Sequence, residues 1–193
     1  MLVYDQRNHG HSGGKNTTYG YYEKYDLRSL AEWALQRLGG AGVIGIHGES
    51  MGAAIALQYA AIDDRASFII ADCPFSTLLG ELTYRLDRQY HLPPIPLLSV
   101  TNFLTTLITG MSFESVSPIR DIVNLQTPVL FIHGQKDSYI PIQMTRELYD
   151  AKKTGIRQLY LAPEAGHAES FWNNRLEYDQ VVGSFLQHLG MNQ

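Results

Sequence analysis

The feature that most constrains the fold is a regular alternation of short apolar runs with segments of helical periodicity. The runs are "LVYD" at 2–5, "GVIGIH" at 42–47, "SFIIAD" at 67–72, "PVLFIHG" at 128–134 and "RQLYLA" at 157–162. They do not alternate polar and apolar residues, which is typical of strands buried on both faces. Strands that alternate with helices form βαβ units. The sequence therefore predicts an α/β fold with a mainly parallel sheet flanked by helices.

The segments between the runs carry the pattern of the helices that would cover such a sheet. Apolar residues at helical spacing predict helices at 27–38, at 53–61, from Pro141 onward and at 181–189. The stretch at about 76–125 is too long for a simple crossover, and insertions of this length in compact domains are usually functional. We expect a single domain at 1–193, with a helical cap inserted at about 76–125.

Composition fits a globular domain and argues against several classes of partner. The 193 residues are 45% hydrophobic and carry a net charge of −4 with no basic patch, which argues against nucleic-acid binding. Cys73 is the single cysteine, so an internal disulfide is excluded and a reducing, cytoplasmic location is favoured. The start of the chain lacks the long apolar core of a signal peptide. The uncharged stretch at 92–113 predicts an amphipathic helix and no membrane span.

A serine lies in the G-x-S-x-G motif formed by residues 48–52, between a predicted strand and a predicted helix. In this setting a sharp turn presents the serine at the carboxyl end of the strand, where it can act as a nucleophile. The backbone N–H of Met51, at the start of the helix, would stabilise an oxyanion. The alternative is a glycine-rich turn in which Ser50 is incidental.

Two later residues supply the partners that a reactive serine needs. Asp137 follows the run at 128–134, and His167 follows the run at 157–162. The carboxyl ends of parallel strands meet at one edge, so Ser50, Asp137 and His167 are expected to form a triad there. The alternatives are a helix-capping aspartate and an ordinary loop histidine.

Two residues directly after the run at 67–72 offer further alternatives. Asp72 is a substitute candidate for the acid of the triad, although Asp137 fits better. Cys73 is interpreted as a small buried residue instead of a second nucleophile, because no partner motif surrounds it.

With these residues in view, the sequence resembles the α/β-hydrolase superfamily, and within it bacterial serine hydrolases of the esterase or serine-aminopeptidase-like kind. Asp5, Arg7, Gly10 and Ser12 match the D-x-R-x-x-G-x-S stretch that follows the fourth strand in many members. The resemblance implies hydrolysis through an acyl-enzyme intermediate with no cofactor. His9 and His11 fall in the same stretch and are assigned a structural role, because nothing beside them completes a metal-ligand set and no metal is expected.

The resemblance also implies that the first three strands of the family fold are absent, as in an N-terminally truncated member. In that fold the third strand lies between the fourth and the fifth, and the loop after it provides a second oxyanion donor. We expect the run at 2–5 to pair directly with the run at 42–47, giving five strands. The alternative is that another chain fills the gap, which would make a homo-oligomer through the open sheet edge.

The main functional hypothesis is a serine esterase that acts on a small-molecule substrate. The amphipathic helix is expected to line an apolar acyl pocket with Phe103, Leu104, Leu107 and Ile108. The same triad would serve a serine peptidase or amidase, and the sequence does not separate ester from peptide substrates. A further alternative is a catalytically impaired chain that only binds a ligand or a partner.

Overall fold

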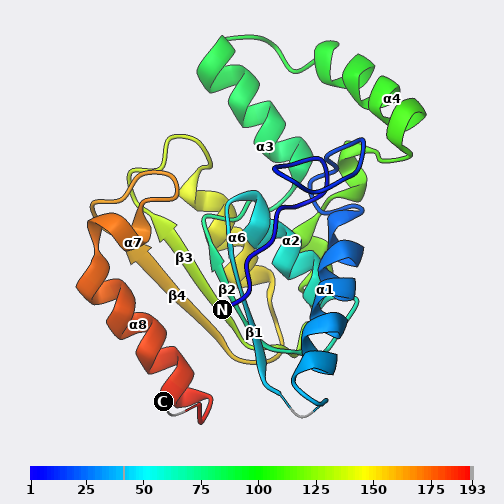
Figure 1. Ribbon diagram of the computed structural model, residues 1–193. Coiled ribbons are helices and arrows are strands. Elements are labelled where there is room, and N and C mark those ends of the chain that lie inside the picture. Colours follow the sequence, from blue (N-terminus) through cyan, green and yellow to red (C-terminus); the bar gives the residue numbers. More distant parts are fainter. Residues whose placement is uncertain (41, 192–193) are drawn as a thin grey trace.

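A single parallel sheet forms the centre of the computed structural model, which describes residues 1–40 and 42–191 (Figure 1). Within these residues the sheet has four strands in the order β1 (Ile44–Glu49), β2 (Ala66–Asp72), β3 (Val129–Gly134) and β4 (Arg157–Ala162). Each neighbouring pair is parallel. Parallel neighbours require crossover connections, usually helical, so the α/β fold predicted from the alternation is confirmed.

Helices cover both faces of this sheet. One buried cluster joins the sheet to α1 (Glu23–Arg37), α2 (Met51–Ala60) and α6 (Ile142–Ala151). A second cluster joins the opposite face to α8 (Arg175–His188), which follows the short helix α7 (Ser170–Asn173). Ile69 and Phe131 belong to the first cluster, and their neighbours Ile70 and Leu130 belong to the second. Burial on both faces explains why the central strands β2 and β3 are apolar. The edge strand β1 departs from the expectation, because every second one of its residues is exposed.

The N-terminal run does not form a strand, so the expected pairing of residues 2–5 with β1 is wrong. In the described residues β1 pairs with β2 alone. Residues 1–6, α1 and β1 instead line a cavity of about 990 Å³. Strands pair only when their backbones lie about 4.7–4.9 Å apart, and this cavity separates the two segments. An apolar run can form a strand only where a ladder partner lies beside it.

The loop after this segment is ordered by the motif residues identified in the sequence. Asp5 accepts a hydrogen bond from the His11 N–H through its carboxylate and from the Ser12 hydroxyl through its carbonyl. Arg7 makes two hydrogen bonds to Asp26 of α1. Gly10 has φ +50°, and a Cβ there would collide with the Asp5 carboxylate. These contacts show that the motif residues stabilise the conformation of this loop.

The long segment between β2 and β3 is helical. It contains α3 (Leu78–Arg85), a π-helical turn (Leu86–Tyr90), α4 (Leu97–Thr109), a 3₁₀ turn (Phe113–Ser115) and α5 (Pro118–Asp121). Figure 1 shows α3 and α4 extending beyond one end of the sheet. Phe75, Leu78 and Met111 pack with Met144 of α6 in a third buried cluster, which joins this segment to the main body. In the described part of the chain, no helix has the length and apolar character needed to cross a membrane.

Candidate active site

Ser50 occupies the turn between β1 and α2. It directly follows the last residue of β1 and is the N-cap of α2, with φ +54° and ψ −120°. This left-handed φ is unusual for a residue other than glycine, and such strain clusters at functional sites. The turn also needs Gly48, because a Cβ there would collide with the backbone of Gly52 and Ala53. The local sequence thus forces the Ser50 side chain to the carboxyl end of the strand.

Asp137 lies in the loop after β3, where the backbone fixes its orientation. One carboxylate oxygen, Oδ1, accepts hydrogen bonds from the N–H groups of Tyr139 at 2.8 Å and Ile140 at 2.9 Å. The other, Oδ2, is thereby directed toward His167, which lies in the loop after β4. The Asp137 side chain is fully buried, and that of His167 is 22% exposed.

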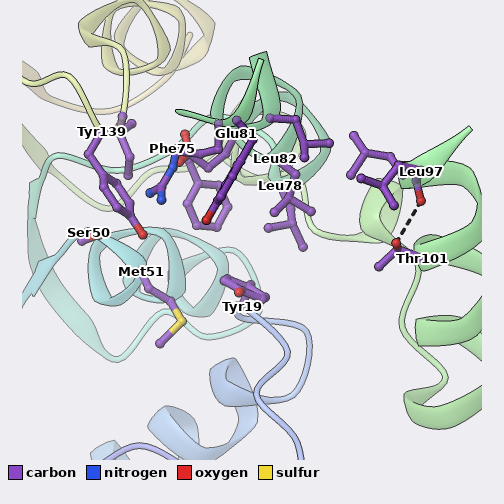
Figure 2. Close-up of a pocket in the computed structure, with 15 residues that line it drawn as sticks. Tyr19, Ser50, Met51, Phe75, Leu78, Glu81, Leu82, Leu97, Thr101 and Tyr139 are labelled. Carbon is purple, nitrogen blue, oxygen red and sulfur yellow. Dashed lines mark hydrogen bonds between the residues drawn. The ribbon is translucent and has the colours of Figure 1, made fainter. Parts of the chain in front are cut away.

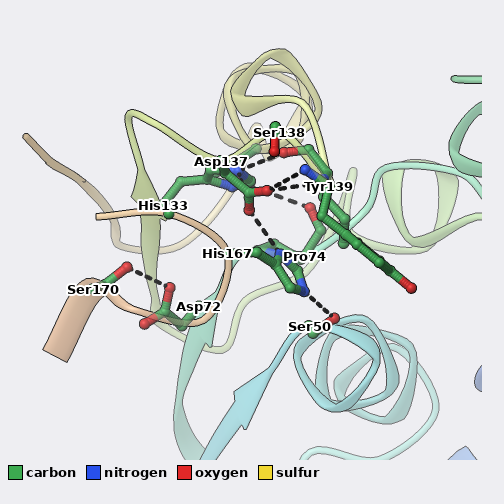
Figure 3. A network of polar contacts seen from close by, with 12 residues as sticks. Ser50, Asp72, Pro74, His133, Asp137, Ser138, Tyr139, His167 and Ser170 are labelled. Carbon is green, nitrogen blue, oxygen red and sulfur yellow. Dashed lines mark hydrogen bonds and ion pairs between the residues drawn. The ribbon is translucent and has the colours of Figure 1, made fainter. Parts of the chain in front are cut away.

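The structure brings the three sequence-predicted residues together at one edge of the sheet (Figure 3). His167 Nε2 lies 2.9 Å from Ser50 Oγ. On the other side of the ring, His167 Nδ1 lies 2.7 Å from Asp137 Oδ2. Both distances fall in the range expected between a nucleophile, a base and an orienting acid. The arrangement can move a proton from Ser50 to His167 while Asp137 holds the imidazole.

Charge on Asp137 sets the tautomer of His167. Burial would raise the pKa of the Asp137 carboxyl, but hydrogen bonds from His133, His167 and the Ile140 N–H hold it well below its ordinary range. The ionised carboxylate accepts the Nδ1–H of His167, which leaves Nε2 free to accept the Ser50 hydroxyl proton.

His133 is a site residue that the sequence reasoning missed. It is fully buried in β3, and its Nε2 lies 3.0 Å from the Ile140 carbonyl and 3.2 Å from Asp137 Oδ2. Its Nδ1 lies 2.7 Å from the hydroxyl of Thr145. A neutral ring with its proton on Nε2 satisfies all three partners. A histidine inside an apolar strand four residues before the acid was the available signal.

Tyr139 covers one face of the His167 imidazole, and Arg85 in turn covers the Tyr139 ring. Tyr139 stacks on His167 with ring centroids 4.6 Å apart and an interplanar angle of 26°. The Arg85 guanidinium of α3 lies over the same Tyr139 ring, 3.4 Å from its centroid. These stacked groups connect α3 to the imidazole and restrict its rotation.

The structure assigns different environments to Asp72 and Cys73. The Asp72 carboxylate accepts a hydrogen bond from Ser170 Oγ at 3.0 Å instead of contacting His167, and burial raises its pKa to about 6. Burial also raises the pKa of the Cys73 thiol. The possible metal-ligand atoms of Cys73, Asp137 and His167 lie within 4.8 Å of one another. Asp137 and His167, however, are already hydrogen-bonded to each other, and His167 also contacts Ser50.

The start of α2 places a backbone donor beside Ser50. Met51 is the first residue of the helix, so its N–H has no carbonyl one turn earlier to which it can donate within the helix. The positive end of the helix favours negative charge at this point. The expected oxyanion donor is thus next to the hydroxyl.

A cavity of about 510 Å³ opens next to Ser50 and is lined mainly by apolar and aromatic groups (Figure 2). Its walls come from Met51, Phe75, the α3 residues Leu78 and Leu82, and Tyr139 of the Asp137 loop. Leu97 and Thr101 of α4 lie at its far end. The cavity is large enough for a small ligand.

The expected pocket residues do not line this cavity. Phe103, Leu104, Leu107 and Ile108 are 63%, 50%, 67% and 72% exposed, so their assignment to an acyl pocket is corrected. Helical periodicity identifies an apolar face, but it does not determine which neighbour the face meets. The first turn of α4 reaches the cavity, whereas the apolar face of the later turns lies against solvent.

Comparisons of sequence show which proteins are similar to this chain. Residues 1–91 match a family described as alpha/beta hydrolase fold. Protein YqkD of Bacillus subtilis is 46% identical over 191 residues, which are 98% of this chain and 62% of YqkD. Human protein ABHD12B is 25% identical over 164 residues, covering 81% of this chain and 42% of that protein. The chain therefore spans less than two thirds of the length of these relatives.

Solved structures extend the similarity to hydrolases. Esterase Pf2001 of Pyrococcus furiosus superposes with a TM-score of 0.74 at 25% identity, covering 95% of this chain and 68% of the esterase. An acylaminoacyl peptidase of Pyrococcus horikoshii superposes with a TM-score of 0.68 at 18% identity, covering 91% of this chain and 29% of the peptidase. The family match and the likeness to the esterase show that this chain has the α/β-hydrolase fold.

Proposed function

We propose that this chain is a serine hydrolase that cleaves carboxylic esters through an acyl-enzyme intermediate. The observation that carries the proposal is the continuous contact from Ser50 Oγ to His167 and from His167 to Asp137, at 2.9 and 2.7 Å. The strained backbone of Ser50 supports it, because such strain clusters at functional sites. The low pKa of Asp137 supports it as well, because an ionised acid orients the base and stabilises its charged form.

In the proposed reaction, Ser50 Oγ attacks the ester carbonyl carbon while His167 Nε2 takes the hydroxyl proton. The carbonyl electron pair moves to oxygen, and the Met51 N–H stabilises the resulting oxyanion. His167 then gives its proton to the leaving alkoxide, and the C–O bond to the alcohol breaks. A water molecule, activated by His167 in the same way, hydrolyses the acyl-Ser50 ester and releases the acid. Asp137 stays ionised and stabilises the imidazolium at each stage.

The cavity beside Ser50 supports an ester with an acyl or alcohol part of modest size. Its volume of about 510 Å³ and its apolar lining match small-molecule sites, which usually combine apolar walls with a few polar groups. The same triad would also serve amide hydrolysis, and the structural likeness to the acylaminoacyl peptidase at 18% identity concerns the fold alone. Amide cleavage is therefore an outcome to be measured.

Covalent labelling tests the proposed nucleophile. The protein is incubated with a fluorophosphonate, and the modified peptide is identified by mass spectrometry. We expect label on Ser50, none in Ser50→Ala and a strongly reduced labelling rate in His167→Ala. Ser115→Ala is the matched control, because Ser115 is exposed and its hydroxyl donates only to the nearby Ser112 carbonyl. Folded protein without label on Ser50 would overturn the proposal.

Turnover separates the substrate classes. Short p-nitrophenyl esters and aminoacyl p-nitroanilides are compared on the same preparation, with Ser50→Ala as the blank. Ester hydrolysis that depends on Ser50 supports the proposal, and cleavage of nitroanilides alone would replace it with an amidase. Labelling of Ser50 without turnover of either class would indicate a chain that binds but does not complete the reaction.

A further inference from the structure

Glu81 is a buried carboxylate in the wall of the cavity beside Ser50. It lies on α3, is 7% exposed, and lines the cavity together with Ser50, Tyr139 and Leu82 (Figure 2). Both of its carboxylate oxygens are buried and have no hydrogen-bond partner among the described residues. A buried carboxylate without partners is costly, so its position in a ligand cavity calls for a ligand group that satisfies it.

The basic residue nearest to Glu81 in sequence on α3 is engaged elsewhere. Arg85 lies one helical turn later and donates from Nε and Nη2 to the side-chain oxygen of Gln89. Its guanidinium also stacks on the ring of Tyr139. Among the described residues, Glu81 forms no ion pair with a basic side chain. Arg85 thus interacts with Glu81 electrostatically but donates no hydrogen bond to its carboxylate oxygens.

The charged groups around Glu81 do not supply a positively charged hydrogen-bond donor to its carboxylate. Burial raises the pKa of Glu81 to about 7, against the opposing effect of Arg85 and His167 and with a small contribution from the charge of Asp137. At moderately alkaline pH Glu81 is an anion with acceptor oxygens alone. The partner that it lacks is a cationic donor.

The other walls of the cavity suit an amine carried on an aliphatic stem. Tyr19 and Phe75 provide aromatic rings, which attract cations through their π faces. Leu78 and Leu82 provide apolar surface from the same helix as Glu81.

We propose that Glu81 is a specificity-determining residue that binds a cationic amine on the part of the substrate that occupies this cavity. The site would then prefer amino-substituted esters over plain alkyl esters of the same length. The proposal rests on the proposed function for its link to a reaction, but the binding itself needs only the cavity and the carboxylate.

Equilibrium binding of simple probes tests the amine site without any turnover. Hexylammonium and 1-hexanol, which share one alkyl chain, are titrated into the protein by calorimetry at about pH 8.5, where Glu81 is ionised. We expect hexylammonium to bind at least about tenfold more tightly than 1-hexanol, as a charge-assisted hydrogen bond predicts. At about pH 5.5, where Glu81 is protonated, the preference should disappear.

Two variants assign the preference to Glu81. Glu81→Gln keeps the size of the side chain and removes its charge, so it should abolish the preference for the amine. Glu114→Gln is the matched control, because Glu114 also follows β2 but is exposed and accepts hydrogen bonds from Asn102. It should leave both affinities unchanged.

Two results would overturn the amine site: equal affinity of wild type for the two probes at alkaline pH, or an unchanged ratio in Glu81→Gln. The wild-type pH series decides the matter even if that variant does not fold. Hexylammonium should bind equally well to Ser50→Ala, so failure of the hydrolase proposal is distinguished from failure of the amine site.

Discussion

Replacing Glu81 with glutamine should stabilise the protein at alkaline pH and leave its stability at acidic pH nearly unchanged. Glutamine resembles the protonated carboxyl in shape and carries no charge at any pH. The comparison therefore isolates the free energy of holding an ionised Glu81 in its cavity. The expected effect follows from the structure, because both carboxylate oxygens of Glu81 are buried without partners.

The size of the effect follows from the pKa of Glu81, which is raised from its ordinary value of 4.5 to about 7. The folded protein then holds a proton that the unfolded chain releases, so the contribution of Glu81 to stability is fully present below pH 4.5 and is lost as the pH rises through 7. At 1.36 kcal/mol per pKa unit the full loss is about 3 kcal/mol. Because the cavity is open to solvent, we expect a difference of about 2 kcal/mol between the two proteins at alkaline pH.

Urea unfolding at a series of pH values from about 4 to 8.5 measures this difference. Asp72 also has a raised pKa, about 6, and its contribution is lost over an overlapping range. The informative quantity is therefore the difference between wild type and Glu81→Gln at each pH, in which the effect of Asp72 cancels.

A difference in unfolding free energy that does not change with pH would refute this reasoning. Such a result would mean that water or a moved Arg85 already satisfies the ionised carboxylate. A variant less stable than wild type at every pH would point to a structural role for Glu81. Glu114→Gln should show no gain at alkaline pH, because the pKa of Glu114 is lowered by hydrogen bonds from the backbone and from Asn102.

Three further substitutions test the site around Ser50. Asp137→Asn should lower kcat/KM for esters by about 10⁴ without unfolding the protein, because an amide favours the wrong tautomer of His167; an effect below about tenfold would contradict its role. His133→Phe removes the donor to Asp137 and leaves the Ile140 carbonyl buried without a partner; urea unfolding should show a loss of about 1–3 kcal/mol. Gly48→Ala introduces a collision with the backbone of Gly52; circular dichroism and labelling should show a destabilised protein with little reaction at the serine, and a normal labelling rate would refute the elbow geometry.

The sequence could predict the fold class and the order of the candidate triad because both depend on local patterns. Apolar runs at 67–72 and 128–134 lie close to β2 and β3, since residues buried on both faces must be apolar. Once the strands are parallel, the residues that follow them share one edge. Ser50, Asp137 and His167 could therefore be predicted to meet there before any contact was known.

Tertiary structure alone decided the features that depend on neighbours distant in sequence. The apolar run at 2–5 lacks a ladder partner, and the apolar face of α4 at Phe103 and Leu107 meets solvent instead of the cavity. Nothing in the residues around Glu81 marked it, because its character comes from burial beside Ser50 and from the engagement of Arg85 with Tyr139. Periodicity specifies which side of an element is apolar, and only packing determines what that side meets.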